Sequence, residues 1–133
     1  MADITKITSH SFGAQFYRAD LHIHSYGTLR LASHDVKDAT MTPEAIVQTA
    51  IAEGLHLIAI TDHNEIGNVE AAILAAGNEL LVVPGVELST SQGHLLCYLP
   101  EFEALQTFVS RLRIVDQCEF PRFIRQPSQR VHT

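Results

Sequence analysis

FYRADLHIH, residues 16–24, begins with an apolar and aromatic lead-in and ends in two histidines, a pattern that predicts a β-strand. Side chains two positions apart along a strand point to the same face, so Asp20, His22 and His24 are expected to project together near the strand's end. Two imidazoles on one face can bind a transition metal, and a nearby carboxylate can orient the rings. An isolated His-x-His pair is more often a solvent-facing part of a strand, but two further clusters of metal-ligand type follow it here.

The composition is that of a single compact domain. The chain has 133 residues, 46% of them hydrophobic and 18% charged, which is enough for one core. Its apolar runs fall far short of the ~20 residues of a membrane span, and no signal peptide is visible, so no membrane association is expected. Cys97 and Cys118 suggest neither a disulfide framework nor a cysteine zinc site, and a reducing, cytoplasmic setting is expected.

The net charge of −6 bears on the kind of partner. Non-specific nucleic-acid binders usually carry a basic face, and no basic block stands out before the last dozen residues. The charge therefore gives no strong sign of direct nucleic-acid binding. It does not exclude a nucleotide substrate held through metal ions.

Strand and helix patterns alternate after the first strand. Thr42-Pro43 predicts a helix start, with Thr42 as the N-cap, and Asn68 is a candidate cap for a second helix. The near-continuous apolar run LIAIT, residues 57–61, is typical of a buried parallel strand. The order predicts an α/β architecture with mainly parallel strands. The predicted helices are 43–54, 69–76 and 101–112, and the later predicted strands are 57–61, 80–83 resuming at 86–88, and 94–99.

Two more clusters lie beside predicted strands. TDHN, residues 61–64, directly follows the buried strand, and functional residues of such sheets gather at the carboxyl ends of strands. Glu87 interrupts an apolar run, where an ionised carboxylate is costly unless it is paired or bound to metal. No lysine or arginine lies between Lys37 and Arg111, so a metal partner is favoured over a salt bridge. His94 begins the next strand after a glycine-bearing turn.

The loop after the first strand offers a weaker candidate, either His34 or Asp35. Asp35 is favoured because a carboxylate would neutralise adjacent cations better than another imidazole. Imidazole with carboxylate suits Zn²⁺, Mn²⁺ or Fe²⁺, and six candidates exceed the needs of one tetrahedral ion. A site with two or more metals activates water and clamps phosphoryl oxygens, which suits hydrolysis of a phosphate ester. The candidate ligands are His22, His24, Asp35, His63, Glu87 and His94.

Three segments together resemble the first motifs of the PHP family, the polymerase and histidinol phosphatase domain. They are DLHIHS at 20–25, ITDHN at 60–64, and PGVEL at 84–88 followed by Gly93-His94. The resemblance implies a distorted (β/α)7 barrel with up to three divalent metal ions. It also implies phosphatase or phosphoesterase activity on a phosphorylated small molecule, nucleotide or oligonucleotide.

Residue roles follow from the same resemblance. His22, His24 and Glu87 would hold one metal, and Glu87 would bridge to a second metal bound by His94. A third would be held by His63 and Asp35. The two aspartates that precede histidines, Asp20 and Asp62, would orient the imidazoles.

The resemblance stops partway along the chain. The family's later histidine motifs have no counterpart after Leu99, so residues 16–115 are expected to form about half of the barrel, an incomplete metal-binding domain. Residues 1–15 are a lead-in, and 116–133 are predicted to be an irregular, disordered tail. The chain would then be a fragment or truncated form.

The alternative hypothesis is an inactive metal-binding remnant or an accessory domain of a DNA-processing assembly. The segments 25–42 and 89–100 also resemble PHP domains placed ahead of an ATPase module.

Overall fold

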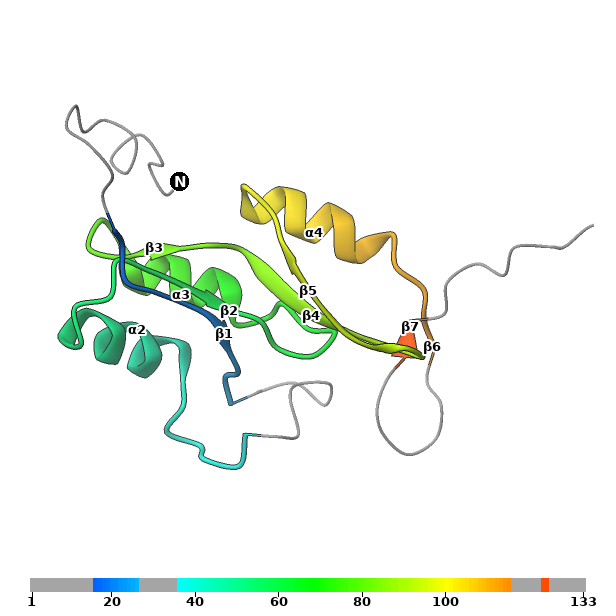
Figure 1. The fold of residues 1–133 in the computed structure, drawn as a ribbon, viewed down its shortest axis with the longest axis horizontal. Helices are drawn as coiled ribbons and strands as arrows, with labels where there is room; N and C mark the ends of the chain where they lie inside the picture. The colour runs from blue at the N-terminus through cyan, green and yellow to red at the C-terminus, as the bar shows by residue number, and fades with distance from the viewer. Residues whose placement is uncertain (1–15, 27–35, 116–122, 125–133) are drawn as a thin grey trace, which may run out of the picture.

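The computed structural model describes residues 16–26, 36–115 and 123–124. These residues form a mixed α/β fold with two sheets (Figure 1), which confirms the predicted α/β class. The elements are β1 (Ala19–Ile23), α2 (Pro43–Ala52), β2 (Leu57–Ile60), α3 (Val69–Ala76), β3 (Leu81–Val82), β4 (Gly85–Thr90), β5 (Gly93–Tyr98), α4 (Phe102–Ser110), β6 (Ile114–Val115) and β7 (Phe123–Ile124).

The first sheet has the strand order β1-β2-β3, and both pairings are parallel. Its central strand β2 is the apolar run predicted to be a buried parallel strand, and that prediction is confirmed. Ile58, Ala59 and Ile60 are fully buried. Because the strands are parallel, β1 and β2 end at the same edge of the sheet. The residues that follow each strand are therefore neighbours.

Helices α2 and α3 pack together beside this sheet (Figure 1). The predicted N-cap of α2 is confirmed, since Thr42 Oγ1 accepts a hydrogen bond of 3.2 Å from the Ala45 N–H. The predicted cap of α3 is wrong. Asn68 has helical backbone angles and makes no side-chain cap, and its amide instead donates to Ser25 Oγ and to the Tyr26 carbonyl oxygen. An N-cap normally has extended angles, which aim its side chain at the first helical N–H groups.

The second sheet has the strand order β5-β4-β7-β6. The prediction of mainly parallel strands holds for the first sheet, but β4 and β5 are antiparallel. Only Ser91 and Gln92 connect them, and so short a connection can join only antiparallel strands. Part of the predicted irregular tail forms β7, which pairs with β4 at Thr90. The rest of that tail and the predicted lead-in lie outside the described residues.

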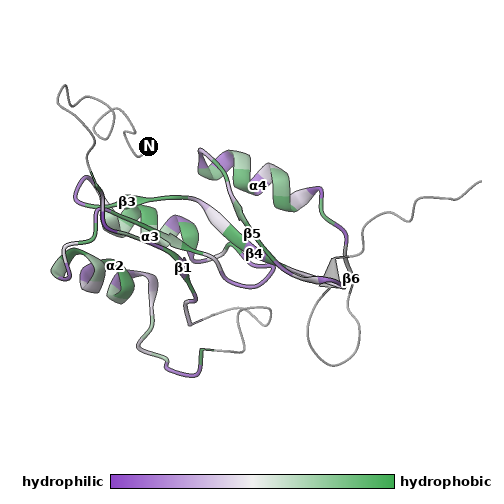
Figure 2. Ribbon diagram, viewed as in Figure 1, coloured by the Kyte–Doolittle hydropathy of each residue, from purple (hydrophilic) through white to green (hydrophobic). Residues whose placement is uncertain are grey.

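Helix α4 runs alongside β5 (Figure 1) and covers a second apolar cluster. Leu105 of α4 is fully buried there with Val69, Val86 and Leu88. Figure 2 shows that α2, α3 and α4 each carry both hydrophobic and hydrophilic residues, as expected of helices with one buried face. Among the described residues, none of these helices has the length and apolar character that crossing a membrane requires.

Candidate metal centre

Glu87 lies in the middle of β4, and its backbone is fixed by the segment that follows β2. The Glu87 N–H donates to the Asp62 carbonyl oxygen, and the Asn64 N–H donates to the Glu87 carbonyl oxygen at 2.8 Å. His63 and Glu87 form a parallel bridge between these segments. Asn64 adopts a positive φ of 53°, which asparagine tolerates better than most residues. The end of β2 and the centre of β4 are thereby held side by side.

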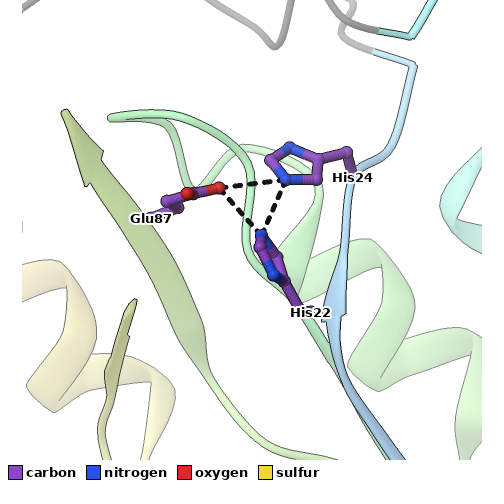
Figure 3. Close-up of side chains that lie close together, drawn as sticks. All are labelled: His22, His24 and Glu87. Atoms are coloured by element: carbon purple, nitrogen blue, oxygen red, sulfur yellow. Dashed lines mark hydrogen bonds and ion pairs between the residues drawn. The ribbon is translucent and has the colours of Figure 1, made fainter. Parts of the chain in front are cut away.

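The Glu87 carboxylate meets the two histidines of β1 and its C-terminal end (Figure 3). Its Oε2 lies 3.0 Å from Nε2 of both His22 and His24. The two Nε2 atoms are also 3.0 Å apart. The Glu87 side chain is only 5% exposed, whereas that of His22 is 49% exposed. The three donor atoms therefore converge on one point that is open to solvent on the His22 side.

The same carboxylate also meets His63 and His94. His94 Nδ1 lies 2.9 Å from Glu87 Oε1, and His63 Nε2 lies 3.7 Å from Glu87 Oε2. The ring centroids of His63 and His94 are 4.6 Å apart. Among the described residues, the sets with donor atoms close enough to share an ion are His22, His24 and Glu87, and His63, Glu87 and His94. Glu87 belongs to both groups.

The donor set fits a transition metal in spacing and in chemistry. Two ligand atoms about 2.1 Å from a shared ion lie about 3.0 Å apart at right angles and about 3.4 Å apart at tetrahedral angles. The triangle formed by His22, His24 and Glu87 has sides of 3.0 Å. Imidazole nitrogens with a carboxylate oxygen suit Zn²⁺, Mn²⁺ or Fe²⁺. The first group therefore has the geometry of a preformed metal site.

The charge state of Glu87 also suits cations. Burial works to raise the pKa of the Glu87 carboxyl, but the hydrogen bond from His22 and the positive charges of His63, His24 and His22 together hold that pKa below its ordinary value. Glu87 therefore stays ionised at neutral pH. A buried carboxylate among imidazoles supplies the negative charge that a divalent ion needs.

The two aspartates predicted to orient the imidazoles contact the backbone of the same segment. Asp20 Oδ1 accepts a hydrogen bond of 3.3 Å from the His22 N–H. Asp62 accepts from the Ser25 N–H at 2.6 Å and from the Ser25 hydroxyl. Burial raises the pKa of Asp62, although the hydrogen bonds from Ser25 oppose that shift. Both carboxylates thus hold the chain on either side of the ligand pair, and their effect on the rings stays a prediction.

Ser89 is a residue of the site that the sequence did not reveal. It is buried, and its Oγ lies 3.3 Å from His63 Nδ1. Nδ1 of His63 thus lies beside Ser89, and Nε2 lies on the side of Glu87. Asn64 Oδ1 accepts a hydrogen bond from the Ser89 N–H at 3.0 Å. The one sequence signal for Ser89 is the two-residue alternation of side chains along a strand. Ser89 lies two positions after Glu87 and thus on the same face.

The structure brings together most of the predicted ligands from four segments. Asp35, and the alternative loop ligand His34, lie outside the described residues. The remaining candidates surround one carboxylate, namely His22, His24, His63, Glu87 and His94.

Comparison with known proteins agrees with the motifs. The family model described as the PHP domain matches residues 20–128. An uncharacterized protein of Methanocaldococcus jannaschii is 35% identical over 82 residues, which cover 59% of this chain and 48% of that protein. A 5'-3' exoribonuclease of Haemophilus influenzae is 35% identical over 75 residues, which cover 54% of this chain and 23% of the enzyme. The chain thus spans about half the length of the first relative and under a quarter of the second.

A solved structure also resembles this fold. It is described as an amidohydrolase from Chromobacterium violaceum with bound sulfate and no metal, and it superimposes with a TM-score of 0.51. The sequence identity is 29%, and the match covers 70% of this chain and 32% of the amidohydrolase.

Proposed function

The chain belongs to the PHP domain family, and from this premise we propose that it is a metal-dependent phosphoesterase. The reaction would be hydrolysis of a phosphate ester in a small molecule, nucleotide or oligonucleotide. The observation that carries the proposal is the position of Glu87, whose carboxylate is shared by two groups of histidines. When bound there, divalent ions would acidify a water molecule and offset the negative charge of phosphoryl oxygens.

Some residues of the site would hold ions, and others lie where they would contact the substrate. The Glu87 side chain is buried, so its carboxylate is held in place. It would therefore fix the distance between the two groups of histidines. His22 and His94 are each about half exposed, at 49% and 48% of the side chain. The open side of the site is therefore the side from which a phosphate ester would approach. Asp35, which lies outside the described residues, is proposed as a further ligand.

The relatives favour a ribonucleotide or oligoribonucleotide as substrate. Both the Haemophilus influenzae protein and a 35% identical protein of Salmonella typhimurium are 5'-3' exoribonucleases. The two sheets with edge strands β1 and β5 support the further proposal that residues 16–115 are part of a distorted (β/α)7 barrel. Other strands of such a barrel, or a downstream ATPase or partner domain, would complete the substrate pocket.

The first experiment measures metal content and hydrolysis in the same preparation. The full chain is purified, stripped with a chelator and reloaded separately with Zn²⁺, Mn²⁺ or Fe²⁺. It is then assayed on p-nitrophenyl phosphate, bis-p-nitrophenyl phosphate and a 5'-phosphorylated oligoribonucleotide. Activity should appear only after metal is added, and His22→Ala should lower it by about 100-fold or more, because a metal ligand is lost.

The matched control is His56→Ala, which removes an exposed histidine that contacts Tyr17 and accepts a hydrogen bond from the Arg18 N–H, outside both groups of candidate ligands. This variant should keep both metal and activity. Hydrolysis that survives chelation and His22→Ala would contradict the proposal. Metal uptake with no hydrolysis of any of the three substrates would instead favour the alternative, a metal-binding domain without turnover.

A further inference from the structure

The strand that carries His22 contains an irregularity. β1 pairs with β2 through Asp20↔Ile58 and Ile23↔Ile60, with a shift of register between those two pairs. Three steps along β1 thus match two along β2, which is the pattern of a β-bulge. Leu21 and His22 fall in this interval and lack a regular ladder partner. Bulges re-aim a side chain, and here the re-aimed residue is a candidate ligand.

A tyrosine from the second sheet holds the bulge. The Tyr98 hydroxyl of β5 donates a hydrogen bond of 2.6 Å to the Leu21 carbonyl oxygen, a short distance for such a bond. Leu21 immediately precedes His22. On the other side of the same peptide bond, the His22 N–H donates to Asp20 Oδ1. The peptide that joins Leu21 to His22 is therefore anchored at both its oxygen and its nitrogen.

A glycine makes room for this contact. Tyr98 is the cross-strand partner of Gly85. A Cβ at Gly85 would lie 2.9 Å from Thr61 Cγ2, closer than real Cβ atoms come, and 3.2 Å from the Tyr98 ring, which would have to shift slightly. The absence of a side chain at Gly85 leaves the tyrosine ring room to lie against β4 and reach β1.

We infer that Tyr98 is a positioning residue for the metal ligand His22, and that it acts through the Leu21 carbonyl in the β1 bulge. Neither Tyr98 nor Gly85 is itself a ligand. The inference rests on the proposed metal-binding function of the site, and it adds a residue from outside the ligand motifs. It explains how a histidine that is half exposed can still lie 3.0 Å from both His24 and Glu87.

The chemistry of Tyr98 suits a permanent donor. Burial, with smaller contributions from the negative charges of Glu87 and Asp20, raises the pKa of the Tyr98 hydroxyl. The hydroxyl therefore keeps its proton and donates throughout the neutral range. Groups that orient metal-binding histidines typically affect metal affinity by about 10–100-fold when they are removed.

The test is Tyr98→Phe, which keeps the ring and removes only the hydroxyl. The Tyr98→Phe variant and the reference protein with Tyr98 intact both carry His94→Ala, so that Co²⁺ binding reports on the group of His22, His24 and Glu87. Affinity for Co²⁺ should fall by about 10–100-fold, with a changed visible absorption spectrum. The free energy of unfolding of the metal-free protein serves as a separate readout, and it should change far less. Tyr17→Phe is the matched control, since it removes a tyrosine hydroxyl before β1 begins, and it should leave the Co²⁺ affinity unchanged.

A second measurement separates this inference from the metal proposal. In the metal-free protein, Tyr98→Phe should speed hydrogen exchange of the His22 amide by about tenfold through local opening. Exchange of the β2 amides should stay unchanged. If the parent protein binds no Co²⁺, the metal proposal fails, while the exchange result still tests the anchoring of the bulge. Unchanged affinity and unchanged exchange would overturn the inference.

A third measurement covers the case in which Tyr98→Phe does not fold. In the unmodified protein, the Tyr98 hydroxyl proton should exchange slowly and show a nuclear Overhauser effect to the Hα of Leu21 or His22. Absence of that protected proton would also overturn the inference.

Discussion

At the scale of single residues, Glu87 is the point on which the proposed chemistry depends. Its carboxylate is almost wholly buried, and the groups around it are four imidazoles from three other segments. An unpaired ionised carboxylate in that position would be costly. The histidines offset part of that cost, and divalent ions would offset the rest. Oε2 lies near His22, His24 and His63, and Oε1 lies near His94, so the carboxylate is within reach of both groups.

Glu87→Gln should therefore remove both metals, whereas single histidine changes should remove one. The amide keeps the size of the side chain but loses the charge. Bound metal per chain, measured by elemental analysis after gel filtration, should fall close to zero for Glu87→Gln. It should fall by about one ion for His22→Ala and for His94→Ala. Equal losses in all three variants would show that the two groups are not separate sites.

Ser89→Ala should weaken the second group selectively. The change removes the oxygen that lies beside His63 Nδ1 and with it one of the contacts that orient the ring. Loss of such a partner typically costs about 10–100-fold in metal affinity. Stepwise Zn²⁺ titration should show weaker binding at the group of His63, Glu87 and His94, with the other group nearly unaffected. Ser110→Ala, which removes an exposed hydroxyl at the end of α4, is the control. Identical titrations for Ser89→Ala and the control would remove Ser89 from the site.

At the scale of elements, the site depends on how β2 and β4 meet. The two strands belong to different sheets. They are joined where the segment after β2 exchanges backbone hydrogen bonds with Glu87. Gly85 lies at the start of β4, close to Thr61 and Tyr98. The approach of the sheets is tight at this position, and this tightness places the histidine after β2 beside the carboxylate of β4.

Gly85→Ala should destabilise the protein by about 1–3 kcal/mol, the usual cost of overpacking. The new methyl group would lie 2.9 Å from Thr61 Cγ2. Thr61→Ser removes that methyl, so Gly85→Ala should cost less in the Thr61→Ser background. Urea unfolding of the four proteins in this double-mutant cycle gives the coupling directly. A coupling of zero would mean that the contact with Thr61 does not limit the approach.

At the scale of the whole molecule, bound metal would join the two sheets. His22 and His24 come from β1 and its end, His63 follows β2, Glu87 lies in β4, and His94 lies in β5. The unfolded chain does not bring these donors together, so metal would bind the folded state selectively. Metal binding and folding are then linked.

Metal should therefore raise the free energy of unfolding. At a free concentration 100 times the dissociation constant, the gain from one site is about 2.7 kcal/mol. Thermal or urea unfolding with and without Zn²⁺ should show this increase, and a chelator should reverse it. Glu87→Gln should abolish the shift, while His56→Ala should retain it. A shift of the same size in Glu87→Gln would assign the stabilisation to metal bound elsewhere.

Local patterns along the chain determined the α/β class, the helix begun by Thr42 and the buried strand β2. They also indicated which residues could be ligands, because Asp20, His22 and His24 alternate along a strand and Glu87 interrupts an apolar run. These features depend on the two-residue period of strands, on helix capping and on the cost of burying a charge. All of them act within a few residues and can be seen in the sequence alone.

Only the tertiary structure decided how those residues meet. The register shift in β1, the space left by Gly85 and the hydrogen bond from the Tyr98 hydroxyl to β1 have no signal in a local pattern. Tyr98 and Leu21 are 77 positions apart in the chain. Their contact arises from the packing of two sheets, and packing depends on the register and approach of whole strands rather than on any short stretch of residues.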